Sequence, residues 1–222
     1  VCAVIKKNPA KGNYDIEVIS GADTATMVKA KKGTVKSSRL TCPETGNSYA
    51  ISDLRGDRRV NGETVYGLRL WDNDDITPRP GDVFQERLYC VRWAIPGEDR
   101  VYAAPDDADF AREAKVLNLV RKLVPDWQEK GYVPTMKIAR GFNTDQPIRE
   151  RGWTYWHHLF TPRQLFMLGT FSKNAVAPDP KDALRVGVAA VGVGAAVDNL
   201  SRLCGINPHF SKGPGSTNHV FT

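Results

Sequence analysis

The sequence predicts an α+β chain in which a β-rich half, residues 1–104, precedes a helical half, residues 105–222. Two patterns support this division. In NYDIEVISG, residues 13–21, apolar and charged side chains alternate, which indicates a half-buried strand. From about residue 106, apolar side chains recur with the period of an amphipathic helix instead. This predicted buried stripe consists of Phe110, Ala114, Leu117, Val120 and Val124.

The first half contains short strands separated by turns. The predicted strands are 3–8, 13–21, 34–42, 48–52, 87–95 and 100–103. A Pro-Ala-Lys-Gly turn joins the first two into a hairpin, and the tight turn CPETG joins the next two. Residues 55–82 are polar and rich in turn-forming residues, so we predict a long loop or insertion there.

Start and stop signals delimit the helices of the second half. The first helix begins at Asp106 or Asp107, either of which can cap it, and Pro125 ends it. A loop is expected over 131–152. The next helix follows TPRQ, residues 161–164, which matches a capping box.

A last helix is predicted from residue 180 to residue 204. Asp179 is its cap, Pro180 takes its first position and Gly205 stops it. Each glycine inside a helix costs about 1 kcal/mol relative to alanine, so we expect this helix to let a neighbouring backbone come very close. The glycines concerned are Gly187, Gly192 and Gly194.

The net charge of +6 and the pI of about 9.2 favour a polyanionic partner. Residues 1–60 hold 11 Lys/Arg against 6 Asp/Glu, which is nearly the whole surplus. Four widely spaced cysteines and no signal peptide fit a reducing cytoplasm. The longest apolar run, residues 183–197, is too short for a membrane helix and contains Arg185. The chain opens without a methionine, so we expect it to be part of a longer protein.

The stretch WHHLFTPRQL, residues 156–165, combines a helix start with basic and aromatic side chains. The capping box explains Thr161 and Gln164, but it requires neither Arg163 nor the aromatic residues just upstream. Free amides at a helix start bind phosphate, and aromatic rings beside a basic residue stack on bases. Packing alone and a nucleic-acid contact therefore both remain open for this stretch.

The turn CPETG resembles half of a zinc site. Zinc knuckles read Cys-Pro-X-Cys-Gly, because the tight turn points two thiolates at one ion. Here Cys42 is the first ligand, and Thr45, a poor ligand, replaces the second. Cys2 is a candidate remnant of another knuckle. The sequence predicts a zinc-ribbon-like region around Cys42, with a metal-free turn as the alternative.

Two other motifs match enzyme signatures only in part. The run LRVGVAAVGVGAAV suggests a dinucleotide-binding turn, but the third glycine position is Val197 and the ribose-binding carboxylate is missing. The segment NPHF, residues 207–210, differs from the motif of amino-methylating enzymes at His209. We therefore expect no self-contained catalytic site in this chain.

LFTPRQLFML, followed later by NLSRLCGINP, resembles a family of large adenine-specific DNA methylases that contain a zinc ribbon. Trp156 and residues 159–165 match the family's Trp-X-X-Leu-Phe-Thr-Pro-Arg-Gln-Leu segment. KKGTVKSSRLTCPETG is similar to the family's Gly-Thr-Val and Cys-Pro-X-Cys-Gly region, with Thr45 departing from it. The second element corresponds loosely to Asn199, Ser201, Leu203 and Cys204.

The resemblance implies that this chain is the central segment of an S-adenosylmethionine-dependent DNA methyltransferase. In such a family the cofactor-binding motif precedes this segment and the catalytic motif follows it. The segment would then face double-stranded DNA without binding S-adenosylmethionine by itself, while the whole protein methylates a flipped adenine. The expected DNA-contacting residues are Trp156, His157, Arg163, Lys31, Lys32, Lys36 and Arg39.

Two other functions stay open from the sequence. The chain could be a non-enzymatic module that docks a partner subunit in a restriction or phage-defence system, with the glycines of 187–194 facing a partner helix. It could also be a small enzyme that binds a dinucleotide through the glycines of 187–197. Sedimentation and ligand binding separate these hypotheses.

Overall fold

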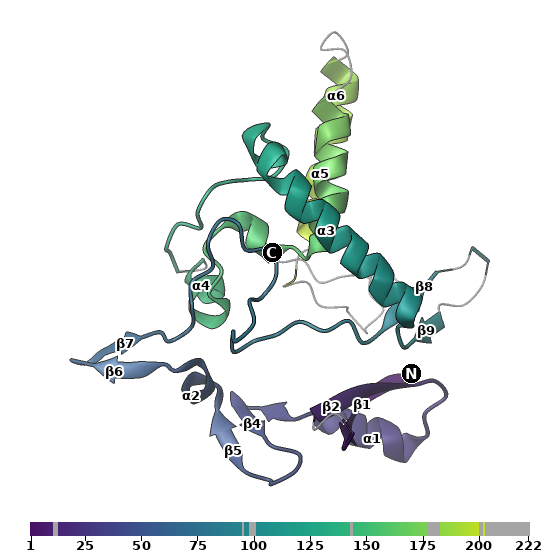
Figure 1. The fold of residues 1–222 in the computed structure, drawn as a ribbon, viewed down its shortest axis with the longest axis vertical. Coiled ribbons are helices and arrows are strands. Elements are labelled where there is room, and N and C mark those ends of the chain that lie inside the picture. Colours follow the sequence, from purple (N-terminus) through teal and green to yellow (C-terminus); the bar gives the residue numbers. More distant parts are fainter. Residues whose placement is uncertain are drawn as a thin grey trace. The chain divides into compact units, whose positions relative to one another are not determined.

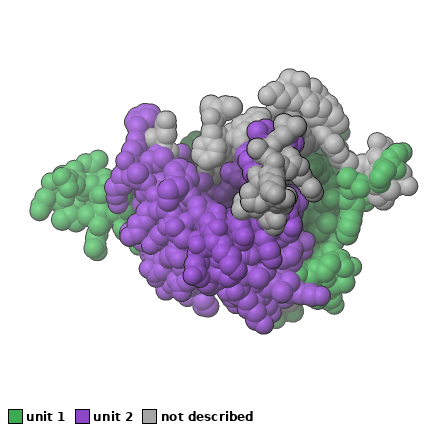
Figure 2. Space-filling view, turned by 90° about the horizontal axis from the view of Figure 1, so that it is seen from above, with its two compact units in different colours: residues 1–67, 85–112 green, residues 68–84, 113–222 purple. Residues whose placement is uncertain are grey.

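The computed structural model of the chain describes residues 1–10, 13–94, 96–97, 101–142, 144–176, 183–199 and 202. It contains helices and short antiparallel sheets, so the chain is of mixed α and β structure, as predicted (Figure 1). Two compact units are coloured separately in Figure 2. Unit 1 comprises Val1–Gly67 and Gln85–Arg112, and unit 2 comprises Leu68–Phe84 and Glu113–Thr222.

These units differ from the division expected at residue 104. The segment 68–84 belongs to unit 2, because its Trp71 and Ile76 are buried in the hydrophobic core of that unit. The sequence predicts this segment in the β-rich half, residues 1–104. Among the described residues, every buried hydrophobic side chain lies in unit 2.

Unit 1 begins with the predicted hairpin. β1 (Cys2–Asn8) pairs antiparallel with β2 (Asn13–Ile19), and Ile5 lies opposite Ile16. α1 (Thr24–Lys32) packs against β1. Asp23 caps this helix, since its carboxylate accepts from the amide of Thr26 at 2.7 Å.

The rest of unit 1 consists of small sheets and one short helix. β3 (Val35–Lys36), β4 (Arg39–Thr41) and β5 (Ser48–Ala50) form a three-stranded sheet, and α2 (Ile51–Arg55) follows. β6 (Arg58–Val60) pairs with β7 (Glu63–Val65), and β8 (Val91–Trp93) pairs with β9 (Val101–Ala103).

The hairpin β6–β7 lies inside the stretch that was predicted to be a loop. Its turn is Asn61-Gly62, with φ values of 50° and 85°. Asn-Gly is the strongest short-range signal for a two-residue hairpin turn, because both residues tolerate positive φ. The loop prediction for 55–82 is therefore wrong for these residues, and the Asn61-Gly62 dipeptide in the sequence would have predicted the hairpin.

The long helix α3 (Asp107–Glu129) starts as predicted and ends later. Asp106 and Asp109 exchange hydrogen bonds between side chain and amide at the start of the helix, at 2.7 and 3.1 Å. Pro125 was expected to end the helix, but the helix continues through it. Phe110, predicted to be buried, is 46% exposed.

Packing of Trp127 accounts for the extension of α3 beyond Pro125. A proline inside a helix costs about 3 kcal/mol. Trp127 is buried in the core, and burying an aromatic side chain stabilises by about 4–6 kcal/mol. The tertiary contact thus outweighs the local penalty.

Unit 2 is completed by α4 (Asp145–Arg151), the 3₁₀ helix η1 (Trp156–Leu159), α5 (Pro162–Val176) and α6 (Ala183–Asn199). α4 lies within the stretch 131–152 that was expected to be a loop. α5 and α6 pack against one another (Figure 1). The predicted cap and stop of the last helix, Asp179, Pro180, Cys204 and Gly205, lie outside the described residues.

The close approach expected at the glycines of α6 occurs elsewhere. Among the described residues, a Cβ built on any of its three glycines meets nothing within 4 Å, so that prediction is wrong for this part of the chain. At Gly169 of α5 a side chain comes close instead: a Cβ there would lie 2.3 Å from the ring of Trp127. None of the helices in the described residues combines the length and apolar character that crossing a lipid bilayer requires.

Candidate nucleic-acid interface

Two adjacent histidines of η1 lie fully buried in unit 2. Nδ1 of His158 accepts hydrogen bonds from the amides of Thr154 and Tyr155, at 3.1 and 3.2 Å. Its Nε2 lies 3.0 Å from the carbonyl oxygen of Asp72. Because Nδ1 accepts, the proton is on Nε2, and the ring joins segments that are 86 residues apart.

Burial, together with the neighbouring His157, lowers the pKa of His158 to about 3. A buried imidazolium loses its hydration, so the neutral ring is favoured. At physiological pH, His158 is therefore a neutral donor and acceptor that holds the backbone in place.

His157 connects two other segments. Its Nε2 lies 2.9 Å from the carbonyl oxygen of Asn73, and its Nδ1 lies 3.2 Å from that of Pro134. Burial lowers the pKa of His157, although both carbonyl oxygens favour the charged ring. The neutral ring donates to the nearer oxygen, that of Asn73, and the Gln128 amide lies 3.5 Å from Nδ1.

These bonds correct the prediction that His157 contacts DNA. The side chain has no exposed surface, and its nitrogens face protein groups. Trp156 is partly buried and packs against the hydrophobic core. Arg163 remains exposed, but its Nε donates to Glu113 at 2.6 Å, so its charge is already paired.

The capping box is present as predicted. The amide of Thr161 donates to the side chain of Gln164 at 2.8 Å, and the amide of Gln164 lies 3.4 Å from the Thr161 hydroxyl. Phe160 and Leu165, expected to form a hydrophobic staple, are both in the core. Packing therefore accounts for most of the stretch 156–165.

Arg202 belongs to the same buried assembly. Its guanidinium lies over the rings of Trp71 and Trp153, 5.4 and 5.5 Å from their centroids. It donates to the carbonyl oxygens of His158 and Ile76 at 2.7 and 2.9 Å. This arginine comes from the NLSRLCG element, and it binds a carbonyl oxygen of the stretch 156–165.

Exposed lysines gather along α1 and the strand that follows it. Lys29, Lys31 and Lys32 occupy the last turn of α1, and Lys36 lies on β3. All four are exposed, and none forms an ion pair within the part of the chain that the structure describes. Arg39 is also exposed but donates to the hydroxyl and carbonyl oxygens of Ser48, at 2.9 and 2.8 Å.

The hairpin tip between β3 and β4 reads Lys36-Ser37-Ser38-Arg39. Lys36 and Arg39 are direct cross-strand partners, and like charges in this position destabilise a hairpin. Both serines have positive φ, 50° and 57°, which is unfavourable for residues with a side chain. An anion bound at this tip would offset the repulsion between the two cations.

Cys42 lies at the turn after β4. The amide of Gly46 donates to the Cys42 carbonyl oxygen, and the Cys42 amide donates to Asn47, at 2.9 and 2.8 Å. Hydrogen bonds from the Thr45 hydroxyl and amide and from the Glu44 amide lower the pKa of the Cys42 thiol. Within the described residues, Cys42 belongs to no group of three potential metal ligands. The predicted zinc role of Cys42 therefore lacks a set of three ligands among them.

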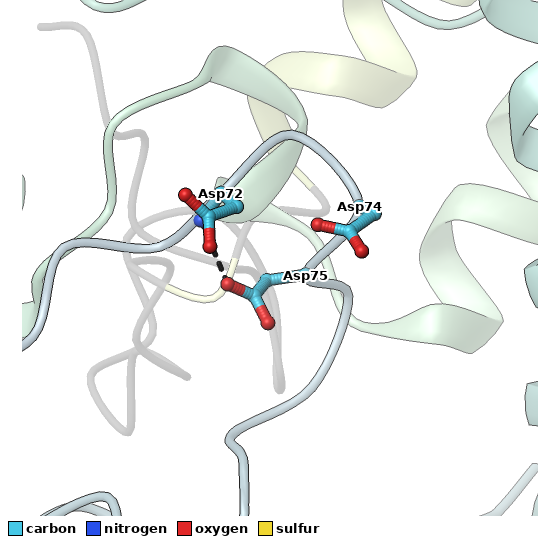
Figure 3. Close-up of side chains that lie close together, drawn as sticks. All are labelled: Asp72, Asp74 and Asp75. Carbon is cyan, nitrogen blue, oxygen red and sulfur yellow. Dashed lines mark hydrogen bonds between the residues drawn. The ribbon is translucent and has the colours of Figure 1, made fainter.

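One acidic cluster has the composition of a metal site. Asp72, Asp74 and Asp75 lie close together, and the amide of Asp72 donates to Asp75 (Figure 3). Arg69 and Arg79 each donate to Asp75, at 2.6 Å, and Arg79 also reaches Asp72 at 2.8 Å. A cation would have to displace these guanidinium groups, so the carboxylates serve an ion-pair network.

Burial opposes ionisation of Asp75, but hydrogen bonds from Arg69 and Arg79 outweigh it and hold the pKa of Asp75 below its usual value. Arg69 also binds Asp82 through two parallel hydrogen bonds of 2.9 and 2.8 Å. This network fixes the internal conformation of the irregular segment 68–84.

Two exposed cations, Lys137 and Arg140, carry no signal in the sequence that marks them as site residues. They border a cavity next to Tyr155, one residue from the stretch that had been singled out.

Comparison of the chain with protein-family models, with curated proteins and with solved structures finds no match.

Proposed function

We propose that this chain is a DNA-recognising segment, central in an S-adenosylmethionine-dependent adenine-specific DNA methyltransferase of the cytoplasm. The observation that carries the DNA-binding part is the row of exposed lysines on α1 and β3, which ends at the hairpin tip. The methyltransferase part rests on the resemblance of WHHLFTPRQL and NLSRLCG to that family.

Unpaired lysines favour a phosphate backbone over a neutral partner. Each lysine that neutralises a phosphate releases a condensed counterion, which favours binding at low salt. Lys31, Lys32 and Lys36 are exposed and close in sequence, so they can contact successive phosphates. The like charges of Lys36 and Arg39, which face each other across the hairpin, add to this preference, because an anion relieves their repulsion.

The revised interface differs from the predicted one in unit 2. Trp156, His157 and Arg163 were expected to contact DNA, but two are buried or partly buried and the third is paired. The proposal therefore rests on Lys31, Lys32, Lys36 and Arg39 of unit 1. A zinc-ribbon ancestry of the Cys42 turn stays a proposal, supported by its hydrogen bonds around the thiol.

The triple variant Lys31→Ala, Lys32→Ala, Lys36→Ala tests the DNA-binding part. We expect the parent chain to bind a fluorescent duplex with a Kd of about 10⁻⁴–10⁻⁶ M at physiological salt. The variant should bind at least about tenfold more weakly. The slope of log K against log salt should fall by about 3, since each lysine contributes about one unit.

The control is a triple alanine variant of Lys115, Lys122 and Lys173, which removes the same charge from exposed positions of unit 2. This control should keep the slope of the parent chain. Equal losses in both variants would mean that only net charge matters, and no binding by the parent chain in low salt would end the proposal.

A second candidate, docking with another copy of the chain, is favoured by the exposed face of α6. Val188 and Val191 are 66% and 75% exposed, and the glycines beside them meet no neighbouring atom. Exposed apolar side chains that gather on a helix surface mark a candidate protein–protein contact. In sedimentation, a stable dimer without affinity for DNA favours this candidate.

A further inference from the structure

Unit 2 contains a cavity of about 320 Å³ that the proposed DNA surface does not use. Three stretches of chain form most of its walls: Leu70–Asp72, residues 137–140 and Thr154–Tyr155. Ile148 of α4 completes it. Its volume is at the lower end of the range for ligand sites, which fits a small ligand.

Backbone hydrogen bonds fix these walls. The amide of Ile138 donates to the carbonyl oxygen of Thr154, and that of Trp71 donates to Gly152, both at 2.8 Å. Gly152 has φ +76°, and a Cβ there would lie 2.1 Å from the Arg69 carbonyl oxygen. His158 binds both the Asp72 and the Thr154–Tyr155 walls, so the cavity is formed before any ligand arrives.

The charges around the cavity favour an anion. Lys137 and Arg140 are exposed, and within the described residues neither forms an ion pair. The one acidic lining residue, Asp72, is bound by Arg79 at 2.8 Å. Two cations thus border the cavity against one carboxylate, which is paired with an arginine that also binds Asp75.

The remaining lining offers an aromatic ring and an apolar floor. The Tyr155 ring lines the cavity, with the Lys137 ammonium 5.7 Å from its centroid. Ile138 and Ile148 are buried and present aliphatic surface. A ring that stacks on Tyr155 would place an attached phosphate within reach of Lys137 and Arg140.

We propose that this cavity binds one nucleotide unit, an aromatic base with its phosphate, held by Tyr155, Lys137 and Arg140. The unit can come from a free mononucleotide or from a single strand of nucleic acid. Phe142 is fully exposed, does not line the cavity and is at most about 7 Å of chain from Arg140, so it is placed to stack on a neighbouring base of a strand.

Calorimetric titration of the full chain with adenosine 5′-monophosphate, adenosine and a ten-nucleotide single-stranded DNA tests this site. We expect the variant Lys137→Ala, Arg140→Ala to bind the monophosphate at least about tenfold more weakly, because two charge-assisted contacts are lost. Adenosine should bind weakly and equally to both proteins. Lys115→Ala, Lys122→Ala is the charge-matched control and should bind like the parent chain.

The source of the nucleotide is decided by Phe142→Ala. If Phe142→Ala weakens binding of the oligonucleotide but not of the monophosphate, the natural ligand of the cavity is a nucleic-acid strand. If only the monophosphate binds, the ligand is a free nucleotide. No binding of either probe, or binding that ignores Lys137 and Arg140, overturns the inference. The site is independent of the duplex surface, so the Lys31, Lys32, Lys36 variant should keep its affinity for the monophosphate.

Discussion

An imidazole can contact nucleic acid, bind a metal or join backbone segments, and the atoms that its two nitrogens face decide among these roles. In unit 2 the four ring nitrogens of His157 and His158 face protein groups, mostly backbone amides and carbonyl oxygens. Their partners in 72–73 and 134 are distant in sequence. The dipeptide alone therefore could not distinguish a structural role from a functional one.

Neutral burial of His158 makes stability depend on pH. Its pKa is near 6.5 when unfolded and about 3 when folded, so the unfolded state binds the extra proton between these values. Stability is unaffected above pH 6.5 and falls as the pH drops below it, by up to about 1.4 kcal/mol per pH unit. Between pH 7 and pH 5, protonation of this one group in the unfolded state should lower the free energy of unfolding by about 2 kcal/mol.

The variant His158→Gln keeps a hydrogen-bond donor and acceptor but does not titrate. Urea unfolding at pH 7 and pH 5 should show that it loses about 2 kcal/mol less stability over this interval than the parent chain. Nitrogen chemical shifts of the parent chain should report a neutral ring with the proton on Nε2 at pH 5. An equal loss in both proteins, or a charged ring at pH 5, contradicts this assignment.

At the scale of helices, the packing of α3 on α5 depends on one glycine. Replacing a helical glycine with alanine normally stabilises by up to about 1 kcal/mol. Gly169→Ala should instead destabilise by about 1–3 kcal/mol, because its Cβ would overlap the ring of buried Trp127. Gly187→Ala on α6 meets no atom within 4 Å and should show the normal stabilising effect.

Urea unfolding of the parent chain and both variants under one condition shows whether each substitution raises or lowers the free energy of unfolding. The two substitutions are chemically identical and both lie inside helices, so propensity cancels in the comparison. Two effects of the same sign would show that α3 and α5 do not pack at Gly169 as described.

Local signals predicted the elements that depend on local contacts. The start of α5 follows from the Thr161–Gln164 capping box, and the first hairpin follows from alternation in 13–21. The end of α3 could not be predicted, because Pro125 signals a stop and only the packing of Trp127 overrides it. The burial of Trp71 in the core could likewise not be predicted, because the segment around it is polar.

The candidate site was predictable to a smaller extent. Lys31, Lys32 and Lys36 were recognised as cations, and the structure leaves them exposed and unpaired among the described residues. Arg163 was recognised too, but its pairing with Glu113 spans 50 residues and has no local signature. Lys137 and Arg140 gain their importance only from the distant walls of the cavity.

At the scale of the whole molecule, folding redistributes the charge that the sequence had concentrated near its start. Unit 1 combines the basic residues 1–67 with 85–112, and holds 15 Lys/Arg against 13 Asp/Glu. Unit 2 holds 16 against 12. Neither unit is strongly basic, so affinity for an anion must come from local groups such as the lysines of α1 rather than from a general field.

The two units also differ in what stabilises them. The buried hydrophobic side chains of the described residues all belong to unit 2, whereas unit 1 contains small sheets and short helices without a buried hydrophobic side chain among those residues. Isolated two-stranded hairpins are only marginally stable in water, because they bury little apolar surface. Unit 1 should therefore open far more readily than unit 2.

Hydrogen exchange of backbone amides at pH 7 tests this difference. We expect amides of α1 and of the β1–β2 hairpin to be protected at least about tenfold less than those of α5 and of α3 beyond Val120. Comparing α1 with α5 matches helix with helix, so the difference reports the core and not the type of secondary structure. Equal protection of the two helices would contradict this prediction. It would show that unit 1 is stabilised by contacts outside unit 1, so the difference in buried hydrophobic side chains would not translate into a difference in stability.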